Sequence, residues 1–386
     1  MRNIIEEAIR GALVRLAQDH PELDPERVEV GVTPSGRPEH GDYSTNVALV
    51  VAGLLNIRDR RGLAEMLSKM FTFPAGTVHK IEVAGPGFLN FFVDDAWYQR
   101  LVAQIVEADE SFGRLTEGEG KTVQVEFVSA NPTGPLTVGH GRNAVLGDVL
   151  ARLYEAAGYQ VTREYYFNDG GRQMRVLAES LRARCRELLE LDFEFPEDGY
   201  QGDYIYDIAQ AMIDEGGDSF KDSDVAVFKN RAQQAIFADI DATLKRIGIG
   251  FDTYFNEHTL YEDGRITQVV EDLRAKDLVY EKEGAVWFKT SEFGQEQDRV
   301  IIKSTGEPTY RLPDIAYHLD KFERGFAWMI NVFGSDHLAT VPDGMAGIRA
   351  LGFDDSRITV VLYQFVTLLR DGKQVKMSPR KATFVT

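Results

Sequence analysis

The densest group of residues that could do chemistry is the segment from Ser129 to Arg142, which reads SANPTGPLTVGHGR. Gly139 has no side chain, so a flat base can approach the backbone closely there. A helical pattern opens at His140, and the free N–H groups and positive dipole end of a helix start favour polyphosphate charge. His140 and Arg142 add hydrogen-bond donors. The segment predicts a nucleotide site; the simpler alternative is a strand–turn–helix corner that carries a surface histidine.

A second candidate is the strongly basic segment from Leu369 to Lys381, which reads LRDGKQVKMSPRK. A basic loop of this kind can close over a triphosphate and stabilise charge that develops on leaving pyrophosphate. The alternative is a solvated run of charge without a chemical role.

Two glycine-rich patterns fail as nucleotide motifs. Gly118 to Thr122 resembles part of a phosphate-binding P-loop, but Leu115 stands where its first glycine belongs and the segment precedes a strand. Gly85 to Gly87 is followed by Asn90 where a dinucleotide fingerprint requires a third glycine.

Composition bounds the class of protein. The chain has 386 residues, enough for two or three domains, and 44% of them are hydrophobic. No apolar run approaches the roughly 20 residues that span a bilayer. Cys185 is the sole cysteine and the seven histidines are scattered, so we expect no disulfide and no metal ligands. The net charge of −18 argues against a general nucleic-acid coat protein, although a local basic face can still dock one specific RNA.

Residues 1–112 are expected to form a small α+β domain. The pattern predicts helices and strands in the following ranges: helices over 1–18, about 45–55 and about 61–70, and strands over 78–83 and 88–93. The polar, glycine-rich residues 113–120 indicate a domain boundary.

Residues 120–386 are expected to form an α/β domain with a parallel sheet, because strands and helices alternate at its start. The predicted elements are strands over 122–128, 160–167, 326–333 and 358–368, helices over 140–157 and 172–191, a helical insertion over about 195–280, and hairpins turning near Gly284 and Gly306. Val145, Val149 and Leu153 lie on one face of the first of these helices.

Taken together, the two candidate segments resemble the HIGH signature (pattern H-x-G-H) and the KMSKS loop of class I aminoacyl-tRNA synthetases, in the right order on a Rossmann-like sheet. Longer strings resemble bacterial arginyl-tRNA synthetases over essentially the whole chain. Besides SANPTGPLTVGHGR they are EHGDYSTNVALVVA (39–52), VAGPGFLNFFV (83–93), EYYFNDGGRQM (164–174), YRLPD (310–314), GSDH (334–337) and KMSPRKATFVT (376–386).

The resemblance implies roles for individual residues. For ATP it implies Thr137, Gly139, His140, Gly334, Asp336, His337, Lys376, Met377 and Ser378; for arginine, Ser129, Asn131, Asn168, Tyr310 and Asp314; and for catalysis, His140, Lys376 and Arg380. A carboxylate at Asp314 suits a guanidinium in bidentate geometry, with Tyr310 as an aromatic wall. From the residues alone, Tyr310 would be read as core packing and Asp314 as a helix cap after Pro313.

Three departures from the family pattern stand out. Thr137 replaces the leading histidine of HIGH, and Pro379 stands where the second lysine of KMSKS belongs. In relatives without that lysine a lysine often precedes HIGH, but Gly134 holds the position here, so Arg380 or Lys381 would take over. The chain also ends at Thr386, where the family continues into a helical anticodon-binding domain; we therefore expect that domain to be absent and tRNA charging to be poor.

The implied activity is ATP-dependent activation of L-arginine and its transfer to tRNA(Arg), with Mg²⁺ accompanying ATP, in a cytoplasmic monomer whose N-terminal domain contacts the tRNA elbow. Two alternatives remain: a synthetase-like module that binds RNA or small molecules without aminoacylating, and an adenylate-forming ligase that does not use tRNA.

Overall fold

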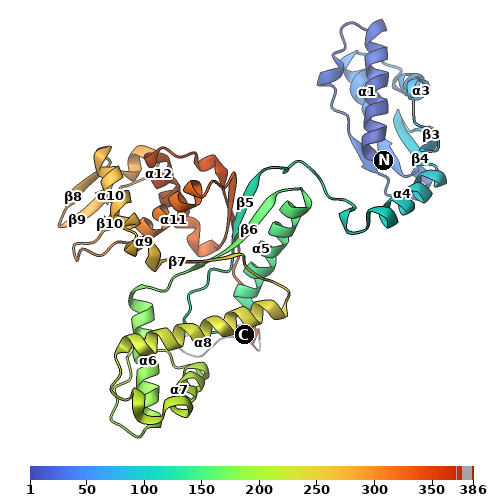
Figure 1. Ribbon diagram of the computed structural model, residues 1–386. Coiled ribbons are helices and arrows are strands. Elements are labelled where there is room, and N and C mark those ends of the chain that lie inside the picture. Colours follow the sequence, from blue (N-terminus) through green and yellow to red (C-terminus); the bar gives the residue numbers. More distant parts are fainter. Residues whose placement is uncertain (371, 376–384) are drawn as a thin grey trace. The chain divides into compact units, whose positions relative to one another are not determined.

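The computed structural model describes residues 1–370, 372–375 and 385–386, and the chain divides into two compact units, Met1–Gly113 and Arg114–Thr386 (Figure 1). Among the helices described, none is both long enough and apolar enough to cross a membrane.

The first unit is an antiparallel sheet packed against helices. Its elements are α1 (Arg2–Asp19), β1 (Val32–Pro34), β2 (Tyr43–Thr45), α2 (Val47–Leu54), α3 (Arg60–Met70), β3 (Val78–Ala84), β4 (Phe88–Val93) and α4 (Asp95–Ala108), with strand order β1-β2-β4-β3. The apolar stripe of α1, which includes Ile5, Ile9 and Leu13, is fully buried. The predicted elements are therefore confirmed to within two residues, whereas β1, β2 and α4 were not predicted.

The second unit is built on a five-stranded parallel sheet of order β12-β11-β5-β6-β7. The strands are β5 (Thr122–Glu126), β6 (Gln160–Phe167), β7 (Thr253–Asn256), β11 (Trp328–Gly334) and β12 (Ile358–Tyr363). After β5, the chain places β6 and then β7 on one side of this strand. The later strands β11 and β12 lie on its other side. The strand order thus reverses between β5 and β11, and open α/β sheets bind ligands in the crevice at that edge.

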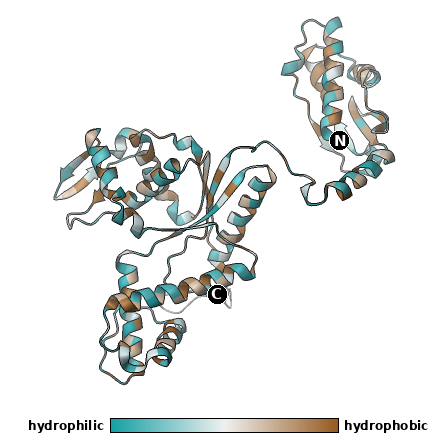
Figure 2. Ribbon diagram, viewed as in Figure 1, coloured by the Kyte–Doolittle hydropathy of each residue, from teal (hydrophilic) through white to brown (hydrophobic). Residues whose placement is uncertain are grey.

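Helices cover both faces of this sheet. On one side, α5 (Val138–Ala156) packs against the sheet, and α8 (Val225–Arg246) shares its apolar cluster with α6 (Gly171–Leu188) and α7 (Asp203–Gly216), which pack against α8 and against each other. The other side packs against the group α9 (His258–Glu262), α10 (Arg265–Ala275), α11 (Arg311–Glu323) and α12 (Val341–Leu351). Hydrophilic and hydrophobic residues alternate along these helices, as expected when one side of a helix faces a core (Figure 2). A smaller antiparallel sheet, β10-β9-β8, and a hairpin complete the unit: β8 (Val279–Lys282), β9 (Ala285–Phe288), β10 (Arg299–Ile302), β13 (Leu368–Arg370) and β14 (Lys373–Val375).

The structure differs from the sequence prediction in three places. The strand predicted over 358–368 ends at Tyr363. The stretch predicted as a helical insertion, about 195–280, also contains β7, which pairs with β6 and is the edge strand of the main sheet. The face of α5 that carries Val145, Val149 and Leu153 is exposed; α5 instead buries small and polar residues such as Asn143, Ala144 and Gly147. A Cβ at position 147 would lie 2.1 Å from the Phe127 ring, so only glycine lets α5 approach β5 this closely.

Candidate active site

The loop after β5 leaves the sheet in an unusual backbone conformation. Val128 and Ser129 have φ angles of 63° and 41°, the left-handed region that costs a β-branched valine most. The Ser129 hydroxyl holds the turn, because it donates to Glu126 Oε1 at 3.1 Å and accepts from the Tyr166 backbone N–H at 3.1 Å. Strain of this kind persists where surrounding contacts enforce it, and the loop at the end of β5 is such a place.

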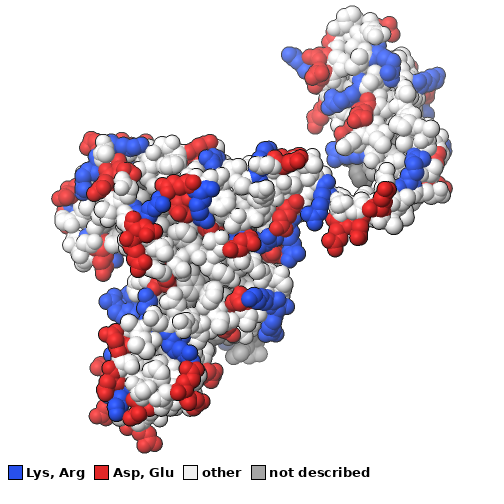
Figure 3. Space-filling view, viewed as in Figure 1, with Lys and Arg blue, Asp and Glu red and all other residues white. Residues whose placement is uncertain are grey.

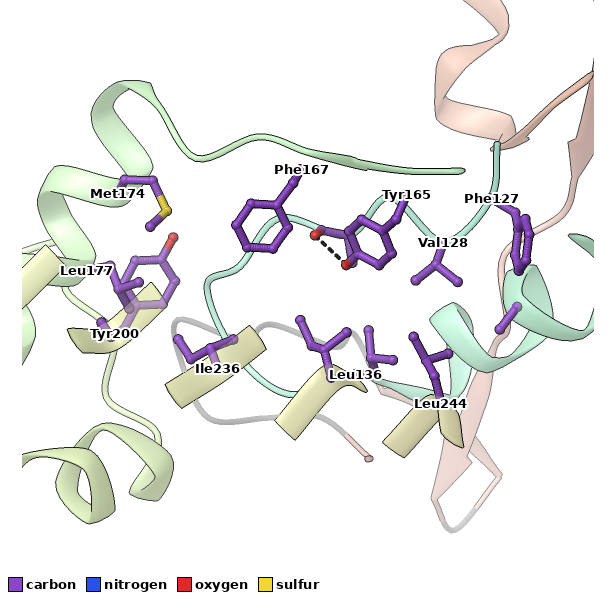
Figure 4. Close-up of a cluster of buried hydrophobic side chains, with 14 of the residues drawn as sticks. Phe127, Val128, Leu136, Tyr165, Phe167, Met174, Leu177, Tyr200, Ile236 and Leu244 are labelled. Carbon is purple, nitrogen blue, oxygen red and sulfur yellow. Dashed lines mark hydrogen bonds between the residues drawn. The ribbon is translucent and has the colours of Figure 1, made fainter. Parts of the chain in front are cut away.

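Two buried side chains hold the same loop in place through hydrogen bonds. The Tyr165 hydroxyl donates to the Ala130 carbonyl at 2.8 Å, within the apolar cluster drawn in Figure 4. Asn143 of α5 accepts from the Val128 N–H at 2.7 Å and donates to the Val332 carbonyl of β11 at 2.9 Å. Asn143 therefore links the end of β5 to β11, the two strands that border the crevice. This role was not predicted from the sequence.

Thr137 and His140 form the start of α5. His140 Nδ1 accepts a hydrogen bond from the Thr137 backbone N–H at 3.1 Å, so the ring proton belongs on Nε2. Burial lowers the pKa of His140, which keeps the ring neutral near pH 7. The helix start thus presents a neutral Nε2–H donor at the positive end of the helix dipole, which suits phosphate oxygens; the Val138 N–H is already bonded to the Val385 carbonyl at 3.1 Å.

The GSDH turn directly follows β11. A Cβ at Gly334 would lie 2.5 Å from Asp336 Oδ1, so the turn is tight at this point. The His337 ring stacks on Phe333 with centroids 4.8 Å apart, while the side chains of Asp336 and His337 remain about half exposed. Arg142, from the other side of the crevice, donates to the Gln364 carbonyl just beyond β12 at 2.8 Å.

Asp314 lies in the first turn of α11, and Tyr310 precedes that helix with 58% of its surface exposed. The Asp314 side chain is 38% exposed, and desolvation by the surrounding protein raises its pKa to about 6. A side chain at Gly344 of α12 would collide with the Asp314 carboxylate, because a Cβ there would lie 2.6 Å from Asp314 Oδ2. Among the described residues, no Lys or Arg lies within ion-pair distance of this carboxylate; its nearest basic group is His318, whose Nδ1 is 3.5 Å away.

A layer of buried polar side chains connects Asp314 to the β5 loop. The sheet contributes Gln124, Glu126, Glu164 and Asn331, and α11 and its end contribute Tyr317, His318, Lys321 and Arg324. Gln124 and Glu126 alternate with the apolar Val123 and Val125 along β5, so one face of the strand is polar and the other apolar.

The hydrogen bonds in this layer form a continuous chain from Glu126 to Asp314. Lys321 Nζ contacts Glu126 Oε2 at 2.7 Å and Asn331 Oδ1 at 2.8 Å. Asn331 Nδ2 donates to His318 Nε2 at 2.7 Å, and His318 Nδ1 donates to the Asp314 carbonyl at 2.8 Å. Burial lowers the pKa of His318 to about 4, so this imidazole is neutral and its tautomer matches both contacts. The layer links the β5 loop to the start of α11.

Other predicted residues lie along the same edge of the sheet. The Asn131 side chain donates to Gln173 Oε1 at 2.9 Å, and Asn168 Oδ1 accepts from the Gly170 N–H at 3.4 Å. The neighbouring Asp169 is buried against His258, whose Nδ1 is 2.5 Å from its carboxylate. Ser129, Asn131, Asn168 and the GSDH turn thus share the carboxyl edge of the parallel strands. Lys376, Met377, Ser378 and Arg380 lie outside the described residues.

The polar layer was not predicted from the sequence, although polar residues within the buried strands could have indicated it. Strands buried on both faces of a parallel sheet are normally near-continuous in hydrophobic residues. Glu126, Glu164 and Asn331 interrupt three such strands. Since buried charges require partners, these interruptions could have indicated the ion pairs with Lys321 and Arg324.

Comparisons with known proteins agree with this arrangement. Residues 101–386 match the family model of class I tRNA synthetases (R), catalytic domain, and residues 2–93 match the arginyl tRNA synthetase N terminal domain. The chain is 59% identical to an arginine–tRNA ligase of Desulfotalea psychrophila, covering 90% of this chain and 64% of that protein, and 49% identical to one of Salinibacter ruber, covering 94% and 68%.

The fold resembles that of the arginyl-tRNA synthetase of Thermus thermophilus, with a TM-score of 0.62 at 21% identity over 94% of this chain and 66% of that one. The chain therefore spans about two thirds of the length of the relatives that it matches. The family resemblance and the fold class predicted from the sequence are both confirmed. The chain belongs to the family of class I arginyl-tRNA synthetases.

Proposed function

We propose that this chain activates L-arginine with ATP and transfers it to tRNA(Arg) as part of translation, in the cytoplasm and as a monomer. The observation that carries the proposal is the Asp314 carboxylate, which burial destabilises and which has no cationic partner among the described residues. A guanidinium would supply that partner in bidentate geometry. Tyr310, one helical turn before Asp314 and largely exposed, can cover the guanidinium plane.

ATP would bind at the crevice between β5 and β11. Its phosphates would face the start of α5, where the His140 Nε2–H and the positive end of the helix dipole are available. The GSDH turn lies at the end of β11 on the opposite side of this crevice. An oxygen of the arginine carboxylate attacks the α-phosphorus of ATP, the bond to pyrophosphate breaks, and arginyl-adenylate forms; positioning and charge stabilisation supply the catalysis.

Lys376, Arg380 and the residues between them would contact the leaving pyrophosphate, as the resemblance implies. Mg²⁺ would enter with ATP. Within the described residues, His, Cys, Asp and Glu side chains form no group of three that could hold a metal ion, so phosphate oxygens and water would supply most of its ligands.

In the second step a ribose hydroxyl of the terminal adenosine of tRNA attacks the carbonyl carbon of the adenylate. The bond to the phosphate breaks, and AMP leaves. On the face shown in Figure 3, Lys and Arg are interspersed with Asp and Glu, which suits recognition by local contacts more than by one broad basic surface. We assign the elbow of the tRNA to the unit Met1–Gly113.

The test is arginine-dependent exchange of pyrophosphate into ATP, measured with and without tRNA(Arg). Exchange should require L-arginine, and citrulline, which has the same shape without the charge, should not replace it. Exchange with another amino acid would contradict the proposed substrate. Binding of arginine and ATP without any exchange, with or without tRNA, would contradict the proposed activity and favour a binding module.

A further inference from the structure

Asp343, in the first turn of α12, is a buried carboxylate that the proposed reaction does not use. Its side chain is 1% exposed. Two guanidinium groups hold it: Nε of Arg299 in β10 contacts Oδ1 at 3.2 Å, and Nε of Arg311 in α11 contacts Oδ2 at 2.8 Å. Asp343 therefore makes two charge-assisted contacts, one with the smaller sheet and one with the first turn of α11.

Arg311 directly follows Tyr310 and precedes Asp314 by three residues, so it stands between the two residues proposed to hold the guanidinium of arginine. Residues three positions apart on a helix are neighbours, and opposite charges at that spacing attract each other. In the described part of the chain, however, Arg311 forms its ion pair with Asp343 and none with Asp314. The Arg311 guanidinium is thus drawn away from the carboxylate nearest to it in the helix.

Both carboxylates lie at the same turn of α12. Because a Cβ at Gly344 would lie 2.6 Å from Asp314 Oδ2, the Asp314 carboxylate rests against the residue that follows Asp343. The two sites differ in their exposure to solvent, since the Asp343 side chain is 1% exposed and that of Asp314 is 38% exposed. An ion pair is screened less where water is excluded, so Asp343 is the stronger partner for Arg311.

The same contact places the Arg311 side chain against Tyr310. The guanidinium carbon of Arg311 lies over the Tyr310 ring, 4.8 Å from its centroid. An aromatic ring attracts a cation at either face, and Arg311 takes one face of this largely exposed ring. Arg311 therefore supports the aromatic wall while the Asp314 carboxylate stays free of it.

We propose that Asp343 is a positioning residue for arginine recognition: it holds Arg311 away from Asp314 and so keeps that carboxylate open to the substrate, an inference that rests on the proposed function. Arg311 carries the same guanidinium group as L-arginine, so a released Arg311 becomes an intramolecular competitor for Asp314. The apparent affinity for a ligand falls with the fraction of molecules whose site is open. Asp343 thereby sets the affinity for arginine through Arg311 and needs no contact with the substrate.

The test is the dissociation constant of L-arginine, and separately that of ATP, measured by calorimetry on the full chain. Asp343→Asn keeps the shape of the side chain and removes its charge. It should weaken arginine binding by roughly 10-fold or more, as if about one molecule in ten or fewer kept Asp314 open, and ATP affinity should be unchanged. Adding Arg311→Gln to Asp343→Asn removes the competitor and should restore arginine affinity to within about threefold of the wild type, the remaining loss being the contact with Tyr310.

Arg299→Gln is the matched control, because it removes the other partner of Asp343 and leaves Arg311 bound; arginine affinity should be kept. Asp343→Ser gives the same comparison if Asp343→Asn does not fold. Arg311→Gln alone tests the idea without any change at Asp343, and it should weaken arginine binding no more than the double variant does.

A double variant that binds arginine as weakly as Asp343→Asn overturns the proposal, since this is the result expected if Asp343 acts only in folding. A loss in Arg311→Gln as large as that in Asp343→Asn also overturns it, because Arg311 would then support binding instead of competing with it. Unchanged arginine affinity in Asp343→Asn overturns this inference alone, whereas a wild-type chain that does not bind arginine contradicts the proposed function as well.

Discussion

His140 Nδ1 and the backbone N–H of Thr137 lie 3.1 Å apart and form a hydrogen bond that sets the tautomer of the imidazole. Because Nδ1 is the acceptor, Nε2 must carry the proton of the neutral ring, and burial keeps the ring neutral. The same backbone N–H would otherwise be one of the unpaired groups at the start of α5. One contact thus caps a helix and fixes a donor at the proposed phosphate site.

His140→Ala should lower the rate of arginine-dependent pyrophosphate exchange by roughly 10²-fold or more, because a preorganised donor to developing phosphate charge is lost. Thr137→Ala should cost less in rate, since its hydroxyl contributes one neutral hydrogen bond of about 1 kcal/mol, and its backbone N–H persists. Thr137→Ser is the conservative control. A larger loss at Thr137 than at His140 would reverse this assignment of roles.

Asp314→Asn should weaken arginine binding by about 2–5 kcal/mol, because a guanidinium would lose its charged partner. Binding of ATP should change little, since ATP would contact α5 and the GSDH turn instead. Isothermal calorimetry with each ligand separately measures both effects. Arginine affinity within a factor of two of the wild type would show that Asp314 does not bind the guanidinium.

The pKa of Asp314 predicts opposite effects of pH on ligand binding and on stability. Burial raises this pKa from an ordinary 3.8 to about 6. The folded chain therefore holds a proton that the unfolded chain has released between these values, and the contribution of Asp314 to stability falls as the pH rises through that window. Arginine binding needs the ionised carboxylate, so arginine affinity should fall as the pH drops below about 6.

Thermal unfolding without arginine tests the stability half of this prediction. Asp314→Asn should unfold at a higher temperature than the wild type at pH 7.5, and the difference should shrink as the pH is lowered toward 4. A difference that stays constant over this range would mean that the carboxyl is not destabilised in the folded chain.

Local patterns predicted the longer strands, because each carries a strong signal of its own. Gln160–Phe167 and Phe88–Val93 were predicted to the residue, as runs of β-branched and aromatic residues bounded by turns. The short β7 was missed, since its four residues lie between the helices α8 and α9 and their pairing with β6 is set by tertiary contacts. The exposed apolar face of α5 was misleading for a related reason: periodicity identifies a face but not what covers it.

In the candidate site, too, some features were predictable from local sequence and others depend on tertiary contacts. Motif resemblance indicated Thr137, His140 and Asp314 as single positions, but contacts between distant segments decide how they are held. Lys321 is the clearest case. It is 195 residues from Glu126 in the chain, and nothing in its local sequence, KFERGF, distinguishes it from a surface lysine, yet it is fully buried.

Lys321 and Glu126 also provide the last prediction. Lys321→Met leaves the Glu126 carboxylate buried with the Ser129 hydroxyl as its remaining neutral partner, so it should destabilise the second unit by about 3–5 kcal/mol. Glu126→Gln should have a similar cost, because the buried ammonium would lose its anionic partner and keep only neutral acceptors. The double variant removes both charges and should cost much less than the sum of the single changes.

Scanning calorimetry measures these effects, because it can separate the unfolding of Met1–Gly113 from that of Arg114–Thr386. Lys245→Met is the matched control: it removes a lysine from the exposed pair with Asp241, and such pairs contribute about 0.3–0.5 kcal/mol. Because the polar layer connects the β5 loop to the start of α11, Lys321→Met should also weaken arginine binding while ATP binding is kept. If the single losses simply added in the double variant, the two groups would not be coupled, and the layer would not be the link between Ser129 and Asp314.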